Sequence, residues 1–109
     1  MGTLTYSGAV VEFDDRLLAH LQIVIIQKLR RGDSFAMSWI DSVAVGNGRS
    51  SIWLHPQTDL YFKFAGSRAP AINREWLTTL MESADGTRGL VVTEEDGALA
   101  RGAATARRG

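Results

Sequence analysis

Cysteine is absent from the 109 residues, and so is any long apolar run. A chain without cysteine has no disulfide, no thiolate metal site and no cysteine nucleophile, which fits a reducing compartment. The longest apolar run, residues 23–26, is far too short to span a bilayer. The N-terminal stretch also lacks the basic region and the continuous apolar run of a signal peptide. We therefore expect a cytoplasmic protein that does not enter a membrane.

Net charge is missing as well, since 12 lysines and arginines balance 12 aspartates and glutamates. A neutral chain has no general attraction to polyanions, so binding of nucleic acid would need a local basic patch. Lysine itself is scarce, because only Lys28 and Lys63 occur and the other basic residues are arginines. High-GC coding would explain this arginine excess without a functional cause.

The hydropathy pattern predicts an α+β fold. Apolar residues at helical spacing predict one helix that begins at Asp14 and Asp15 and ends at Gly32, and a second from Asn73 to Gly86. Period-two alternation predicts strands around Leu4 and Tyr6 and in residues 9–13, 35–40, 50–55, 60–65 and 90–93. The order β-β-α-β-β-β-α-β then gives a single antiparallel β-sheet with two helices packed on one face. We expect one domain over residues 1–93 and a disordered tail over residues 94–109, which lack apolar periodicity.

Two tryptophans are expected in the core, and the role of two isoleucines is open. Trp39 shares the parity of inward positions on its strand, and Trp76 lies on the apolar stripe of the second helix, so both are expected inside. Ile23 and Ile26 fall off the core face of the first helix. They would contact a loop or form a homodimer interface.

No pattern typical of catalysis is present. His20 and His55 stand far apart without spaced carboxylates, so we expect no metal site. A nucleophile elbow, a phosphate loop and a dinucleotide fingerprint are all missing, so we expect no catalytic residues and no cofactor. The glycine-rich segment 46–49 fits a turn that needs positive φ, and only weakly an anion-binding loop.

What remains is a set of cationic and aromatic residues at element ends and on one strand parity. These candidate ligand-binding residues are Arg30, Arg31, Arg49, Arg74, Trp53, Tyr61 and Lys63. Guanidinium groups bind phosphates, and exposed aromatic rings stack on bases. The alternative is structural: Trp53 would pack under a loop or helix, Tyr61 would be a cross-strand partner, and the paired arginines would complement a helix end.

Several short motifs give the chain a family resemblance. They are FDDR at 13–16, KLRRG at 28–32, SW at 38–39, GRS at 48–50, IWL at 52–54 and AINREWL at 71–77. In this order they resemble a family of small actinobacterial proteins of about this length, over positions 1–93. Its members are often labelled ATP-dependent DNA ligase, and the resemblance implies a role beside DNA-processing proteins.

The ligase label can be compared with the chemistry of the chain. DNA ligases of the nucleotidyltransferase type attach adenylate to the lysine of a Lys-x-Asp-Gly motif, but Lys28 and Lys63 are both followed by other residues. We therefore expect no autonomous ligase activity. The sequence favours a non-catalytic cytoplasmic binding module for nucleic acid or another phosphate-bearing ligand. The alternatives are a protein-interaction or homodimerisation module, and a protein associated with a DNA ligase.

Overall fold

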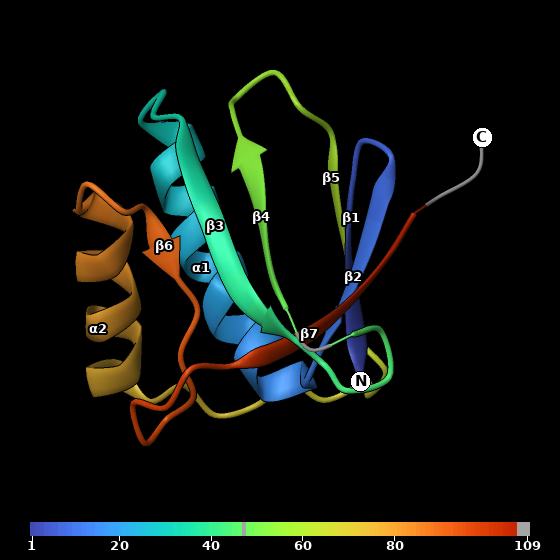
Figure 1. Cartoon of the computed structure of the whole chain (residues 1–109). Helices are drawn as coiled ribbons and strands as arrows, with labels where there is room; N and C mark the ends of the chain where they lie inside the picture. Colours follow the sequence, from blue (N-terminus) through green and yellow to red (C-terminus); the bar gives the residue numbers. More distant parts are fainter. Residues whose placement is uncertain (47, 107–109) are drawn as a thin grey trace.

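The sheet of this protein is built from strands at both ends of the chain. The computed structural model describes residues 1–46 and 48–106, which form two helices and seven strands. In chain order these are β1 (Gly2–Tyr6), β2 (Ala9–Phe13), α1 (Asp15–Arg30), β3 (Phe35–Asp41), β4 (Arg49–Leu54), β5 (Leu60–Lys63), α2 (Arg74–Asp85), β6 (Leu90–Val91) and β7 (Arg101–Ala106). Across the sheet the order is β4-β3-β7-β2-β1-β5, and β6 also pairs with β3. In Figure 1, α1 runs behind β3, and α2 lies on the side of β6.

The first third of the chain folds as its local pattern predicts. β1 and β2 form an antiparallel hairpin in which Tyr6 pairs with Ala9. The Asp14 side chain accepts a hydrogen bond from the backbone N–H of Arg16 at 3.1 Å, which caps the N-terminus of α1. Gly32, with φ of 82°, follows the other end of α1, as expected for a glycine after a helix. The α+β class is confirmed.

The sheet is mixed, so the prediction of a purely antiparallel sheet is wrong. β6 and β7 both run parallel to β3, whereas the β1–β2, β1–β5, β2–β7 and β3–β4 pairs are antiparallel. The reason is α2, which carries the chain back to the end of the sheet where β3 starts, so that β6 runs in the direction of β3 (Figure 1). Periodicity shows where a strand lies but not which neighbour it pairs with.

The C-terminal segment also differs from the prediction. Residues 101–106, predicted as part of a disordered tail, form β7 between β3 and β2. The predicted order therefore lacks its last strand, and residues 107–109 of that tail lie outside the described residues. The inward positions of this segment hold Ala100, Gly102 and Ala104, which are too small to produce an apolar pattern. The strand is held largely by backbone pairing, which leaves no signal in side-chain hydropathy.

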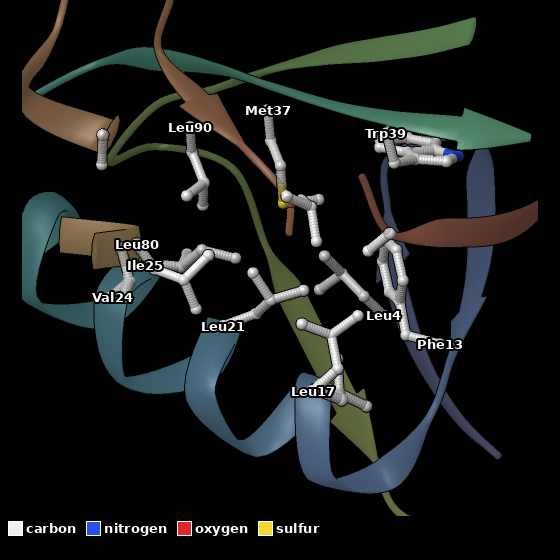
Figure 2. Packing of buried hydrophobic residues seen from close by; sticks show 14 of the residues in the cluster. Leu4, Phe13, Leu17, Leu21, Val24, Ile25, Met37, Trp39, Leu80 and Leu90 are labelled. Carbon is white, nitrogen blue, oxygen red and sulfur yellow. The ribbon is translucent and has the colours of Figure 1, made fainter. Parts of the chain in front are cut away.

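One core fills the space between the helices and the sheet (Figure 2). Phe13 and Trp39 meet edge to face, with ring centroids 5.7 Å apart and planes at 81°. Trp39 and Trp76 are 3% and 5% exposed, which confirms both as core residues. Neither helix of the described chain has the length and apolar composition needed to cross a bilayer.

Candidate functional site

The outer face of β3, β4 and β6 carries an open hollow of about 620 Å³. Arginines line two sides of it: Arg49, the first residue of β4, and Arg88, in the turn before β6. Between them lie Ser38 of β3 and Ser51 of β4. We call this feature the Arg49–Arg88 hollow.

Strand alternation places these side chains on one face. On β3, Phe35, Met37 and Trp39 point into the core, so Ser38 points outward. The β3–β4 register pairs Ser38 with Ser51, Ile40 with Arg49 and Ala36 with Trp53. Cross-strand pairs share a face of the sheet, so Arg49, Ser51 and Trp53 form a row along β4 on the outer face.

The floor of the Arg49–Arg88 hollow is a pair of hydroxyl groups. Ser38 Oγ and Ser51 Oγ are 2.7 Å apart and share a hydrogen bond. In such a pair one hydroxyl donates to the other, so the hydrogen of the second hydroxyl is left to donate to a ligand. Apolar side chains of Ile40, Val91 and Leu99 surround the pair.

The charges around this floor have one sign. Among residues 1–46 and 48–106, no hydrogen-bond or ion-pair partner is found for the guanidinium groups of Arg49 and Arg88. No carboxylate is among the described residues that line the hollow. Arg101 of β7 pairs in register with Ile40 and donates from Nη1 to the Asp41 carbonyl oxygen at 2.9 Å, which adds a third guanidinium to this face. The arrangement suits an anion.

Trp53 extends the site beyond the hollow. It is 57% exposed and lines a smaller hollow of about 360 Å³ together with Ala36 and Arg88, and this hollow is also bordered by Lys28 and by the acidic residues Asp33 and Asp85. Arg88 borders both hollows, so the two adjoin, and the smaller one extends to the C-terminal ends of α1 and α2. Arg49 and Trp53 are four positions apart on β4, which spans about 13 Å in an extended strand. The structure thus places Arg49 and Trp53, both predicted as ligand-binding residues, on one surface.

The remaining predicted arginines lie elsewhere. Arg31, just after α1, forms ion pairs with Asp33 at 3.7 Å and Asp85 at 3.5 Å. Arg30 is exposed at the same end of α1, whereas Arg74 is the first residue of α2. The Arg31–Asp85 pair joins the C-terminal ends of the two helices, so Arg74 lies at the far end of α2, about 16 Å away along its axis. Arg30 and Arg31 are therefore not brought together with Arg74.

Tyr61 and Lys63 lie on a different part of the outer face. They belong to β5, where Tyr61 pairs with Thr5 and Lys63 with Thr3 of β1. β5 and β4 form the two edges of the sheet and do not pair with each other. The Tyr6 hydroxyl of β1, the strand next to β5, nevertheless donates to the Trp53 carbonyl oxygen, so the end of β4 lies close to β1. Tyr61 is 62% exposed and lines a hollow of about 560 Å³ that also contains Asp59 and no basic side chain. The hollow lined by Tyr61 is therefore a poor site for an anion.

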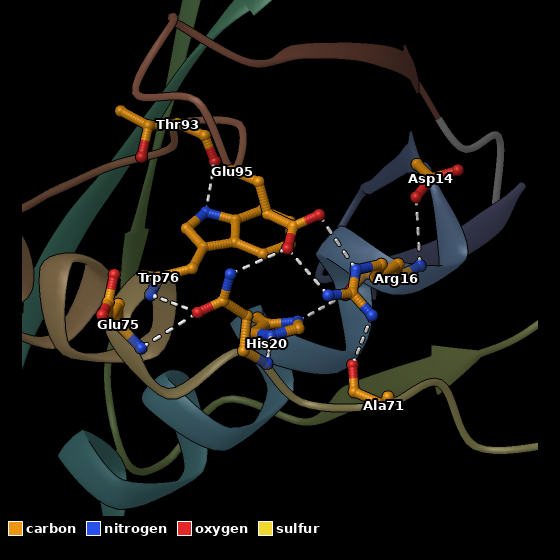
Figure 3. Close-up of polar contacts among 9 residues, drawn as sticks. Asp14, Arg16, His20, Ala71, Glu75, Trp76, Thr93 and Glu95 are labelled. Carbon is orange, nitrogen blue, oxygen red and sulfur yellow. Dashed lines mark hydrogen bonds and ion pairs between the residues drawn. The ribbon is translucent and has the colours of Figure 1, made fainter.

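A network of ion pairs and hydrogen bonds lies at the N-terminal ends of the helices (Figure 3). Arg16 and Glu95 pair through two contacts, Nη2–Oε2 at 2.7 Å and Nε–Oε1 at 3.1 Å, and Asn73 Nδ2 donates to Glu95 Oε2 at 2.8 Å. These hydrogen bonds, that from Arg16 foremost, lower the pKa of Glu95 to about 2. Every charged group of this network has a partner. We therefore interpret the network as structural, because it holds Glu95 to the N-terminal ends of α1 and α2.

The histidines are also engaged in structure. His20 is fully buried, contacts the Arg16 carbonyl oxygen through Nδ1 at 2.7 Å and accepts from the Asn73 backbone N–H through Nε2 at 2.9 Å. Its ring lies against that of Trp76, with centroids 4.3 Å apart. His55 contacts Thr58 within the turn after β4. Within the part of the chain that the structure describes, no group of three or more potential ligand residues is placed to hold a metal ion.

Sequence reasoning did not identify Arg88, Ser38 or Ser51 as site residues. The two serines could have been found, because both occupy outward positions of predicted strands next to Trp39 and Trp53. Arg88 gave no signal, because it lies in a turn and reaches the site only through the pairing of β6 with β3.

Comparison with known proteins gives a family but no activity. The family described as domain of unknown function DUF7882 matches residues 1–95. No curated protein and no solved structure is significantly similar to the chain. The match supports the predicted small family without an assigned function. The actinobacterial source and the ligase label stay predictions.

Proposed function

We propose that this chain, which belongs to the DUF7882 family of domains of unknown function, binds single-stranded nucleic acid. The surface involved is the outer face of β3, β4 and β6, with Arg49, Arg88 and Trp53 as its principal contacts. The observation that carries the proposal is an exposed tryptophan that shares a hollow with Arg88 and a strand with Arg49, two arginines that have no partner among the described residues.

Trp53 offers a large aromatic surface on the outer face of the sheet. Trp53 is more than half exposed, although its strand buries Leu54 and half-buries Ile52 on the other face. A base stacked on an aromatic side chain contributes about 1–3 kcal/mol, whichever base it is. The proposed ligand would cover Trp53 with a base and would not require a particular sequence.

The Arg49–Arg88 hollow supplies the phosphate contacts in this proposal. A guanidinium group offers paired N–H donors to phosphate oxygens, and the hydroxyl pair of Ser38 and Ser51 offers one more donor. About 13 Å separates the ends of the β4 row, so a ligand must extend over more than one nucleotide to contact both Arg49 and Trp53. This requirement favours a polymer over a free mononucleotide.

We propose a binding role without catalysis, in the cytoplasm. Lys28 and Asp85 are engaged with each other: the hydrogen bond with Asp85 raises the pKa of Lys28, and that with Lys28 lowers the pKa of Asp85. The cysteine-free composition supports the cytoplasmic location.

The experiment is a titration of a fluorescently labelled oligothymidylate of twelve residues, followed by anisotropy at several salt concentrations. Arg49→Ala, Arg88→Ala and Trp53→Ala should each weaken binding. Arg68→Ala is the matched control, since Arg68 is an exposed arginine in the loop before α2, away from β4. Absence of binding by the unaltered protein at low salt would overturn the proposal, and equal losses in Arg68→Ala would show that only total charge matters.

Two other predicted roles would give different results. A homodimer through Ile23 and Ile26 of α1 is supported by the 41% exposure of Ile26, and Ile26→Ser would then abolish a dimer seen by light scattering without affecting oligonucleotide binding. A partnership with a DNA-processing enzyme, which the family resemblance implies, would appear as tighter binding of nicked duplex than of a single strand.

A further inference from the structure

β7 joins two parts of the sheet that do not otherwise pair. On one side lie β4, β3 and β6, and on the other β2, β1 and β5. β7 pairs with β2 from Ala9–Ala106 to Glu12–Ala103, and with β3 through Ile40–Arg101 and Asp41–Gly102. In Figure 1 it crosses the front of the molecule between these two parts. The position it fills is a slot with strand edges on both sides.

The slot selects its occupant by size. A Cβ atom on Gly102 would lie 2.6 Å from Phe13 Cε1 and 2.9 Å from Trp39 Cδ1, so the aromatic pair leaves room only for glycine. Ala100 is fully buried two positions before it, and Ala104 packs against the core two positions after it. An occupant therefore needs the pattern alanine, any residue, glycine, any residue, alanine.

Such small side chains bury little apolar surface, so β7 depends mainly on backbone hydrogen bonds. Any extended segment with the same pattern can make these bonds, and the same segment of a second copy fits by identity. Exchange of an identical element between two copies preserves its contacts, so the two arrangements differ mainly in the hinge and in the entropy of association.

The hinge lies in the turn that precedes β7. Before the turn the chain is anchored: Trp76 Nε1 donates to the Thr93 carbonyl oxygen at 2.9 Å, and Glu95 is held by Arg16 and Asn73. The turn itself depends on Gly97, with φ of 91°, and on the 2.7 Å hydrogen bond from Glu94 N–H to the Ala98 carbonyl oxygen. Extension of residues 96–99 would break the Thr93–Leu99 bridge and the 3.0 Å hydrogen bond from Ala100 N–H to the Val92 carbonyl oxygen. It would release β7 and leave the Arg16–Glu95 pair intact.

We propose that β7 exchanges between two copies of this chain, so that each copy places its residues 100–106 in the slot of the other. The product is a dimer in which β2 and β7 of every β2–β7 pair come from different copies. In the exchanged dimer, Leu99 of the hollow and Arg101 of β7 come from the other copy, whereas Arg49, Arg88 and Trp53 stay in the copy that carries the slot.

The chain lacks cysteine, which permits a clean crosslinking test. Val10 of β2 pairs with Thr105 of β7. Val10→Cys and size-tagged Thr105→Cys chains are mixed, unfolded, refolded together and oxidised, and the disulfide-linked pairs are separated by size. In an exchanged dimer the two cysteines come from different copies, so a linked heterodimer forms.

The matched control mixes Thr3→Cys and Lys63→Cys chains. These positions pair between β1 and β5, which stay within one copy during exchange, so only background linkage is expected. The proposal requires several-fold more heterodimer from the first mixture than from the second, rising with protein concentration during refolding. Equal yields from the two mixtures would overturn it.

Two further variants test the β2–β7 pairing and the hinge separately. The double variant Val10→Cys with Thr105→Cys must form a disulfide, within one copy or between copies, and if it forms neither, the β2–β7 pairing and the proposal with it are wrong. Deletion of residues 96–98 makes the turn impossible, so this chain should elute as a dimer by light scattering. A folded monomer from the deletion variant would contradict the assignment of the hinge.

Discussion

Arg16 and Glu95 are 79 positions apart in the sequence, yet two hydrogen bonds of 2.7 and 3.1 Å join their side chains. The pair connects the first turn of α1 with the loop that separates β6 from β7. Asn73, the N-cap of α2, donates to the same carboxylate at 2.8 Å, so a single glutamate connects three segments (Figure 3).

The lowered pKa of Glu95 predicts a specific loss of stability in acid. Its ordinary value of 4.5 falls to about 2 in the folded state, because Arg16 and Asn73 stabilise the charged form. The contribution is complete above pH 4.5 and is lost as the pH falls towards 2, since the unfolded chain binds the proton first. Urea unfolding should show a smaller difference between pH 6 and pH 3 for Glu95→Gln than for the unaltered protein. Glu82→Gln, at an exposed position of α2, should keep the full difference.

Replacement of His20 should destabilise the fold. His20→Leu keeps the buried volume but leaves the Asn73 N–H, which donates to Nε2 at 2.9 Å, without its acceptor. A buried donor without a partner costs about 1–3 kcal/mol. The free energy of unfolding from urea titration measures the loss, and Gln27→Leu on the exposed side of α1 serves as the control. An unchanged free energy in His20→Leu would contradict the hydrogen bonding described.

Gly102 should not tolerate even one methyl group. Gly102→Ala places a Cβ atom 2.6 Å from Phe13 Cε1, in the edge-to-face pair with Trp39, and overpacking of this kind costs about 1–3 kcal/mol. Ala103 faces the other side of the same strand, so Ala103→Val should change the unfolding free energy little. If both variants unfold at the same denaturant concentration as the unaltered chain, β7 does not lie over Phe13 and Trp39.

These positions show which parts of the fold follow from local sequence. The hairpin β1–β2 and helix α1 are predicted correctly because turn, cap and apolar stripe all occur within a few residues of each other. β7 is missed because its fit depends on Phe13 and Trp39, which are distant in sequence, and because its own side chains carry no apolar pattern. The same limit applies to the parallel pairing of β6 with β3, which depends on the path of α2.

The residues of the candidate site were likewise predicted only in part. Strand parity identifies Trp53 as outward-facing, and the glycine-flanked loop draws attention to Arg49. The predicted set also included Arg30, Arg31 and Arg74, which helix geometry separates, because Arg31 pairs with Asp85 at the far end of α2 from Arg74. Charge along a sequence does not show which charges meet, and Arg88 completes the site only through tertiary packing.

Salt dependence should distinguish the two kinds of contact proposed on the outer face. Each phosphate contact to a single strand adds about 0.7 to the slope of log K against log salt, so Arg49→Ala and Arg88→Ala should each reduce the slope by about that amount. Trp53→Ala should instead weaken oligonucleotide binding by about 1–3 kcal/mol with the slope unchanged, because stacking releases no counterion. Anisotropy titrations at four salt concentrations measure both quantities. A Trp53→Ala variant with unaltered affinity would leave the exposure of this tryptophan without a ligand, and the arginines would then bind phosphate alone.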